Sequence, residues 1–198
     1  MKKFLTLIVL ALLVTGCSFG EKSLYAEKVK RYESSWKAIL DQDKFAASSP
    51  YFNVKATMGK KGDGYVYEIV VDQPRIALYE VEVVVVANNE PYNKETMMPS
   101  AGIFDGQYSM IPNQTDTEKT FVGGFQLNGE TSESTVNLKI LVSWKDYSHL
   151  ETTREFLEFN LEYKDGPVVP VEVAPTAPTE DAPAEDAPAE DAPADEEA

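Results

Sequence analysis

The feature of this 198-residue sequence that most restricts its fold is a repeated alternation of apolar and polar residues between positions 52 and 163. Successive side chains of a β-strand point to opposite faces, so a period of two is typical of strands with one buried face. A valine-rich stretch at 75–88 predicts either one bent strand or two short ones. The alternation itself is clearest at 135–144 and recurs at 52–58, 65–71, 119–127 and 152–163.

These segments predict one folded domain over 50–165, with six or seven strands and no helix between them. Gly62, Gly64 and Pro74 lie in short turns between strands, which favours hairpins. We therefore expect a mostly β protein, an antiparallel β-sandwich that resembles immunoglobulin-like or fibronectin-type-III-like domains. Its expected core contains Tyr79, Val81, Val83, Val85, Val136, Leu138, Ile140, Trp144, Leu157, Phe159 and Leu161.

One α-helix is expected before the strands, over 23–49. Its apolar residues recur at steps of three and four and share one face, and Pro50 follows it. This amphipathic helix either packs its aromatic face on the following domain or lies on a membrane. Six basic and five acidic residues between Glu21 and Lys44 are too balanced for strong attraction to anionic lipid, which favours packing on the domain. The face comprises Tyr25, Val29, Tyr32, Trp36, Ile39 and Leu40.

The C-terminal segment, 166–198, has the composition of a disordered tail. It holds ten acidic residues and no basic one, and the unit Glu-Asp-Ala-Pro-Ala occurs three times between Glu180 and Ala194. Such a segment has little apolar surface to offset the entropy of folding, and its charges repel one another. We expect an extended spacer that does not help the domain to fold.

The first seventeen residues have the pattern of an export signal. Lys2 and Lys3 precede an apolar run from Phe4 to Val14, too short to cross a hydrocarbon core of ~30 Å as a helix. Val14-Thr15-Gly16-Cys17 then places one aliphatic residue, two small residues and a cysteine in succession. This order resembles the lipobox of bacterial lipoproteins, in which the cysteine sulfur receives a diacylglyceryl group and a signal peptidase cuts just before it.

The resemblance implies that 1–16 is a signal peptide and that Cys17 is lipidated. The polar residues that follow the cysteine predict a short tether over 17–22. It also implies a protein anchored in the cell membrane on its extracytoplasmic face, or in the outer membrane if the cell has one. The alternative is an ordinary signal peptide that happens to contain a cysteine. Cys17 is the sole cysteine, so no intramolecular disulfide can form.

The net charge of the chain limits which classes of partner it could bind. The formal net charge is −15, and residues 17–165 contain sixteen basic and twenty-three acidic residues, a balance of about −7. Nucleic-acid binding requires a basic surface that this composition does not offer. We expect the membrane as one partner, an unknown envelope or extracellular partner, and no nucleic acid.

Residues that could support catalysis are scarce. The chain has one histidine, His149, expected in a surface loop, and a zinc site would need several histidine or cysteine ligands. Calcium needs only oxygen ligands, and loops containing Asp63, Asp105, Asp116 and Asp146 could supply them at one end of a sandwich. The alternative is that these aspartates serve their own turns. We expect no enzyme activity, no cofactor and no bound metal.

The irregular stretch from Pro91 to Pro112 is unusually rich in aromatic residues and methionine. Such loops either bind a partner or cover an open end of the core. The sequence thus predicts a non-enzymatic, membrane-anchored module that binds a ligand or partner, with a spacer subunit of an envelope complex as the alternative. The candidate partner-binding residues are Tyr92, Met97, Met98, Phe104 and Tyr108.

Overall fold

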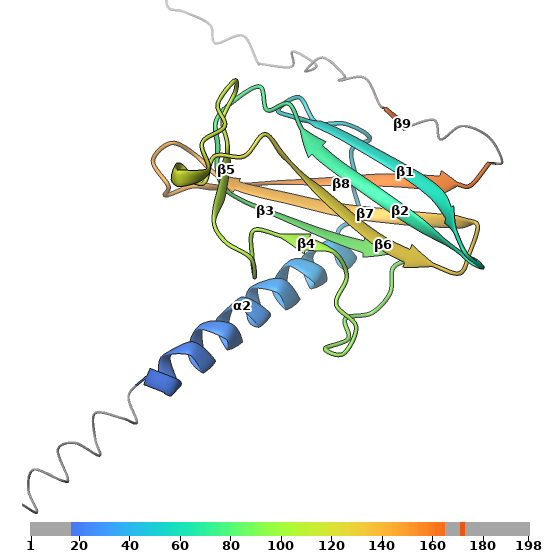
Figure 1. Cartoon of the computed structure of the whole chain (residues 1–198), viewed down its shortest axis with the longest axis horizontal. Helices are drawn as coiled ribbons and strands as arrows, with labels where there is room; N and C mark the ends of the chain where they lie inside the picture. The colour runs from blue at the N-terminus through green and yellow to red at the C-terminus, as the bar shows by residue number, and fades with distance from the viewer. Residues whose placement is uncertain (1–16, 165–170, 173–198) are drawn as a thin grey trace, which may run out of the picture.

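Two antiparallel sheets pack face to face, and one helix lies across the outside of the second sheet (Figure 1). The computed structural model describes residues 17–164 and 171–172. The first sheet has the order β6-β2-β1-β9. Its strands are β1 (Asn53–Lys61), β2 (Gly64–Asp72), β6 (Gly124–Thr131) and β9 (Val171–Glu172). The fold class predicted from the alternation is therefore confirmed as an antiparallel sandwich.

The second sheet has the order β4-β3-β7-β8, and a short strand, β5, also pairs with β3. Its long strands are β3 (Leu78–Ala87), β7 (Thr135–Lys145) and β8 (Thr152–Glu162). The remaining elements are β4 (Ser100–Ala101), β5 (Tyr108–Met110) and a 3-10 turn, η1 (Thr117–Lys119). The valine-rich stretch therefore forms one strand, β3, and not two short ones.

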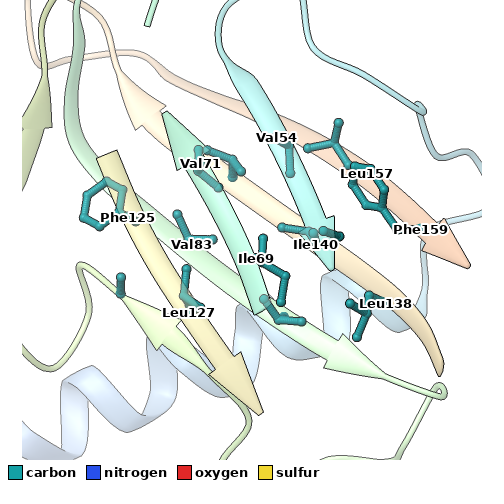
Figure 2. Close-up of a cluster of buried hydrophobic side chains, with 14 of the residues drawn as sticks. Val54, Ile69, Val71, Val83, Phe125, Leu127, Leu138, Ile140, Leu157 and Phe159 are labelled. Atoms are coloured by element: carbon teal, nitrogen blue, oxygen red, sulfur yellow. The ribbon is translucent and has the colours of Figure 1, made fainter. Parts of the chain in front are cut away.

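The space between the sheets is filled by the residues that alternation places inward (Figure 2). Strand β7 contributes Val136, Leu138, Ile140, Val142 and Trp144, all at most 4% exposed. The expected contributions of β8 are confirmed in the same way. The inward residues of both sheets are mostly branched aliphatics, and they form one apolar cluster between the sheets.

Tyr79 departs from the prediction that it faces the core. A β-bulge lies between Tyr79 and Glu82, so β3 has one residue more than β7 between these two pairs. Leu78 and Val81 both point into the core as a result, while Tyr79 is only half-buried. Glu80, inside the bulge, has φ of 48°, in the left-handed region that non-glycine residues seldom adopt.

Strand β6 also differs from the alternation at 119–127, because it begins at Gly124 and continues through Asn128 and Gly129, a dipeptide typical of turns. Gly129 pairs with Tyr67 of β2. A Cβ atom at Gly129 would collide with the Tyr67 hydroxyl, so the glycine makes room for that ring within the ladder. The dipeptide that suggested a turn is therefore a packing site.

The helix, α2 (Cys17–Leu40), begins earlier and ends earlier than the predicted range of 23–49. No proline interrupts 17–22, so those residues continue the helix and do not form a separate tether. After Leu40 the chain turns, and Ala46 pairs with the edge of β8 at Leu157. The Ala46 N–H donates to the Phe156 carbonyl at 2.9 Å, which draws this segment away from the helix and covers the sheet edge.

One part of the predicted disordered range 166–198 has a described structure. Val171 and Glu172 form β9 and pair antiparallel with Ala56 and Lys55 of β1. The outer edge of β1 offers unpaired backbone groups, which explains why a short strand forms there. The remainder of the predicted tail, like the predicted signal peptide, lies outside the described residues.

Candidate functional site

The C-terminal half of α2 is part of the folded domain. Tyr32, Trp36 and Ile39 are at most 1% exposed, and they pack on the outer face of the second sheet. The prediction that the aromatic face of the helix packs on the domain is confirmed for these residues. Their partners from the sheet are Val84 and Val86 of β3 and Leu141 of β7, whose side chains point away from the inter-sheet core.

Two hydrogen bonds tie this half of the helix to irregular segments. The Tyr32 hydroxyl donates to the Met98 carbonyl at 3.0 Å, and Trp36 Nε1–H donates to the Glu90 carbonyl at 3.0 Å. Burial raises the pKa of Tyr32 well above its ordinary value, so the phenol remains a proton donor. The helix therefore fixes the backbone of the segment between β3 and β4.

Three of the predicted partner-binding residues surround Tyr32. The rings of Tyr92 and Phe104 have centroids 6.2 and 5.6 Å from that of Tyr32, and Met98 is half-buried between the two hydrophobic clusters. The Tyr67 hydroxyl lies 3.8 Å from the Met98 sulfur, and burial raises the pKa of Tyr67 to about 12. These side chains join the helix to the sandwich.

The other two predicted residues lie apart from that group. Tyr108 is in β5 and packs edge-on against Phe125 of β6, with centroids 5.9 Å apart. Met97 is 42% exposed, which leaves it the most accessible of the five. Four of the five therefore make packing contacts within the domain, and partner binding by this stretch stays a prediction.

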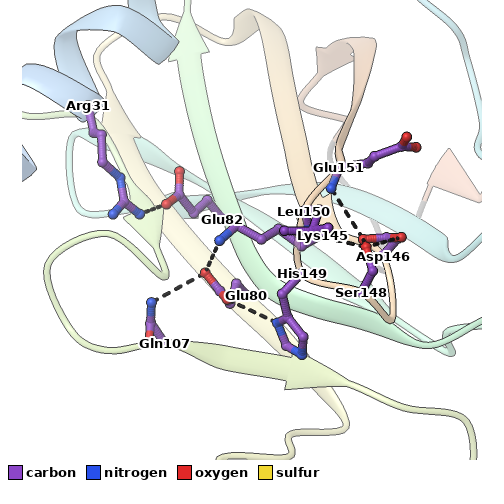
Figure 3. A network of polar contacts seen from close by, with 10 residues as sticks. All are labelled: Arg31, Glu80, Glu82, Gln107, Lys145, Asp146, Ser148, His149, Leu150 and Glu151. Atoms are coloured by element: carbon purple, nitrogen blue, oxygen red, sulfur yellow. Dashed lines mark hydrogen bonds and ion pairs between the residues drawn. The ribbon is translucent and has the colours of Figure 1, made fainter.

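A charged recess of about 240 Å³ lies between α2 and the outer face of the second sheet. Figure 3 shows the polar contacts around it. Arg31 of α2 forms an ion pair with Glu82, and Lys145 of β7 forms one with Glu80 at 2.9 Å. The recess is lined by Arg31, Ser34, Ser35, Glu80, Glu82, Ser143, Trp144, Lys145, Thr152 and Arg154.

Glu80 is the centre of the network in Figure 3. Besides Lys145, its carboxylate is 3.0 Å from His149 Nδ1 and accepts a hydrogen bond of 3.4 Å from Gln107. The hydrogen bond from Lys145 is the largest influence on the carboxyl and holds its pKa below the usual range, with burial acting in the opposite direction. These contacts help to hold the strained bulge in place.

Arg154 distinguishes the recess from an ordinary ion-pair network. Arg31 and Lys145 are matched by Glu82 and Glu80, but the Arg154 guanidinium has no hydrogen-bond or ion-pair partner among residues 17–164 and 171–172. Ser143, opposite Arg154 in the β7–β8 ladder, is a buried serine on the recess wall. A planar guanidinium beside hydroxyl groups is suited to binding a carboxylate or phosphate oxygen pair.

In the sequence, Glu80, Glu82 and Arg154 alternate with the expected core residues of 75–88 and 152–163, so alternation predicts that they face outward as ordinary polar residues. Alternation correctly placed Glu82 and Arg154 on the outer face of their strands. Their convergence depends on the order β3-β7-β8 and on α2 lying alongside, neither of which a single sequence states. The available signal was that one glutamate precedes the valine run and a second interrupts it, because acidic residues are unusual in a strand buried on both faces.

The four aspartates considered for calcium are not brought together. The Asp105 carboxylate accepts from the Gly102 N–H at 2.8 Å, that of Asp116 from the Glu118 N–H, and that of Asp146 from the Ser148 hydroxyl. These are hydrogen bonds within their own turns. Within residues 17–164 and 171–172, no group of three or more histidine, cysteine, aspartate or glutamate side chains is arranged to hold a metal ion.

The N-terminal end of the chain identifies the class of protein. A family model described as the prokaryotic membrane lipoprotein lipid attachment site matches residues 1–18, which include Cys17. The chain is a membrane-anchored bacterial lipoprotein. Comparison with curated proteins and with solved structures gave no match. Among the described helices, none has the length and apolar character required to span a bilayer.

Proposed function

We propose that this lipoprotein is a non-enzymatic binding module whose charged recess takes an acidic group of a ligand or of an envelope or extracellular partner. The observation that carries the proposal is the unpaired Arg154 guanidinium beside the buried Ser143 in a recess built from α2, β3, β7 and β8. In a chain of net charge −15, a positive group with no partner is well suited to a specific contact. Display on the extracytoplasmic face, in the outer membrane of a cell that has one, is part of the proposal.

The absence of enzyme activity is also proposed. His149 Nδ1 is engaged by Glu80, and the His149 ring lies against Tyr79 with centroids 4.8 Å apart. The neighbouring Ser148 hydroxyl donates to Asp146 at 2.7 Å. A serine nucleophile would need a base within hydrogen-bond reach, and the polar partners of both side chains are already other residues.

The strand order supports the immunoglobulin-like class. Strands β1, β2 and β6 form one sheet, while β3, β7 and β8 form the other with β4 on its edge. In immunoglobulin-like sandwiches the first, second and fifth strands share one sheet, and the third, sixth and seventh share the other. With β5 left uncounted, β6, β7 and β8 take the fifth, sixth and seventh places, and these six strands divide in the same way. The fourth strand, β4, differs, because it lies beside β3 here and with the first, second and fifth strands in constant-type immunoglobulin domains.

A second candidate is a spacer or accessory subunit of an envelope complex. The feature that favours it is the N-terminal half of α2, which extends away from the sandwich and separates the domain from the lipidated end (Figure 1). Crosslinking of cells followed by purification distinguishes the candidates, because a spacer subunit should recover a stoichiometric envelope complex whether or not Arg154 is intact.

Photo-crosslinking in cells tests the recess. A photoreactive residue replaces Ser35, at the recess, or Gln126, which is exposed on β6 of the opposite sheet. We expect discrete adducts from position 35, none from 126, and loss of the adducts on Arg154→Gln. The matched control is Lys60→Gln, because Lys60 is an exposed cation at the β1–β2 hairpin. Equal adducts from both positions, or adducts insensitive to Arg154→Gln, would contradict the proposal.

A further inference from the structure

The N-terminal half of α2 leaves the sandwich with apolar side chains uncovered. We call residues 17–31 the projecting segment, because Tyr32 is the first buried residue among the helix residues 23–40, whose burial is described. Residues 23–27 are all exposed, and they include Leu24 at 60% and Tyr25 at 59%. Figure 1 shows this part of α2 extending beyond the edge of the sheet.

The apolar face of the helix continues into this segment. Tyr25, Val29, Tyr32 and Trp36 are spaced by four, three and four residues, so they share one face. The ring of Tyr25 is 6.1 Å from that of Phe104, and Lys28 Nζ donates to the Phe104 carbonyl. The same face that packs on the sandwich therefore continues toward the N-terminus of the helix, where Tyr25 and Lys28 contact Phe104.

The projecting segment is a weak helix by itself. It contains Ser18, Gly20 and Ser23, and a glycine in a helix costs about 1 kcal/mol relative to alanine. Helices shorter than about 12–15 residues are marginal in water even with favourable sequences. A helix of this length and composition needs a surface on which to bury its apolar side.

The nearest such surface is the membrane that carries the lipid anchor. Leu24 follows Cys17 by seven residues, two helical turns, which places it about 10 Å along the helix axis. The segment has four basic and two acidic residues. Because Arg31 is paired with Glu82, the remaining balance is three basic to two acidic residues, a formal charge of +1 within a chain of −15. Anionic headgroups would attract this segment and repel most of the remaining chain.

We propose that the projecting segment of α2 lies on the membrane surface, with Leu24 and Tyr25 in the headgroup layer. A helix inclined by about 60° from the membrane normal would hold Leu24 about 5 Å above Cys17, within a headgroup layer of about 5–8 Å. Tyrosine favours this interface because its ring is apolar and its hydroxyl remains hydrated. The helix then sets the orientation of the sandwich, which a flexible tether would leave free.

Spin-label accessibility in the full-length lipidated protein tests this placement. Since Cys17 is the sole cysteine and its sulfur is the expected site of acylation, a cysteine introduced by Leu24→Cys or Ser34→Cys is the one thiol available to label. Ser34 is the matched control, because it is exposed on the same helix but beside the domain. The protein is reconstituted in vesicles of phosphatidylglycerol and phosphatidylethanolamine.

We expect the label at position 24 to be relaxed more strongly by dissolved oxygen than by a water-soluble nickel chelate, and the label at 34 to show the reverse. Exchange of phosphatidylglycerol for phosphatidylcholine should reduce the difference. Vesicle flotation reports anchoring separately. A protein that floats with a water-exposed label at 24 overturns this proposal alone, whereas a protein that does not float contradicts the anchor and this proposal together.

Discussion

The two buried clusters of the molecule differ in what encloses them. The inter-sheet core lies between two hydrogen-bonded sheets and is filled largely by aliphatic side chains that follow a period of two. The cluster beneath α2 is enclosed by a helix, by the outer face of β3 and β7, and by the irregular segment from 88 to 107. It is rich in aromatic rings, and two side-chain hydrogen bonds help to hold its irregular side.

Strand β3 connects the two clusters. Val83 and Val85 point into the inter-sheet core, while Val84 and Val86 point toward α2, so the strand is buried on both faces. This explains why its sequence is a continuous valine run, which alternation alone would not predict. The difference between the clusters suggests that the first determines whether the domain folds, and the second determines how firmly the helix and loops are held.

The largest expected effect is truncation within the inter-sheet core. Leu138→Ala should lower the free energy of unfolding by about 2–5 kcal/mol, because it leaves a cavity that the surrounding ladders cannot close. Urea unfolding followed by circular dichroism measures this change. Val70→Ala, on the half-buried outer face of β2, is the matched control with a smaller expected loss. An unchanged midpoint for Leu138→Ala would show that the register of β7 is wrong.

A smaller effect is expected in the cluster beneath α2. Tyr32→Phe keeps the ring but leaves the Met98 carbonyl without its donor, which should lower stability by about 0.5–1.5 kcal/mol. Amide exchange of residues 88–99 should increase with little change in the sheets. Tyr147→Phe removes a hydroxyl from a ring that is 84% exposed, and it serves as the control. If Tyr32→Phe destabilised the sheets and the loop equally, the two clusters would form one cooperative unit.

The pH dependence of stability gives a third comparison. Burial raises the pKa of Glu155 in β8, so its contribution to stability is complete below the unfolded-state pKa and is lost as pH rises through the folded-state value. Glu155→Gln should therefore raise the melting temperature near neutral pH, and the gain should vanish in acid. The lowered pKa of Glu80 has the opposite consequence, so Glu80→Gln should remove stability that the wild type has above the unfolded-state pKa.

Melting curves of both variants between pH 3 and pH 8 would measure these two trends. Glu155 is half-buried, so solvent screening keeps its effect below that of a core truncation. Parallel pH profiles for Glu155→Gln and Glu80→Gln would contradict the opposite environments seen in the structure.

The smallest effect is expected from removal of the acidic C-terminal segment. Neither cluster includes a described residue beyond Tyr163, and deletion of 174–198 leaves β9 in place. Stability should change by less than about 0.5 kcal/mol, the usual range for surface changes. Backbone NMR shifts of residues 50–164 provide the second measurement. Widespread shift changes would show that the segment packs on the sandwich.

How far the sequence predicted this structure depends on the range of the interactions involved. Strands β1, β2, β7 and β8 followed from alternation, which is local. The outward position of Tyr79 could not be predicted in this way, because a bulge depends on how β3 pairs with β7. The early end of α2 depends on Ala46 pairing with the distant Leu157.

The charged recess could not be predicted from the sequence for the same reason. Arg31, Glu82 and Arg154 are far apart in the chain, and each has an ordinary surface pattern in its own segment. Only the lateral order of β3, β7 and β8 brings them to one place. The aromatic stretch was recognised as unusual, but its role in holding α2 required the contacts of Tyr92 and Phe104 with Tyr32.

The central claim is that α2 belongs half to the domain and half to the membrane. Amide hydrogen exchange along the helix tests it most directly, with the lipidated protein in anionic vesicles compared with a Cys17→Ser protein that begins at residue 17. The account predicts slow exchange of residues 32–40 in both samples, because that half is buried on the sandwich. It predicts slow exchange of 21–29 only in the lipidated sample. Equal protection of 21–29 in both samples, or none in either, would contradict the claim.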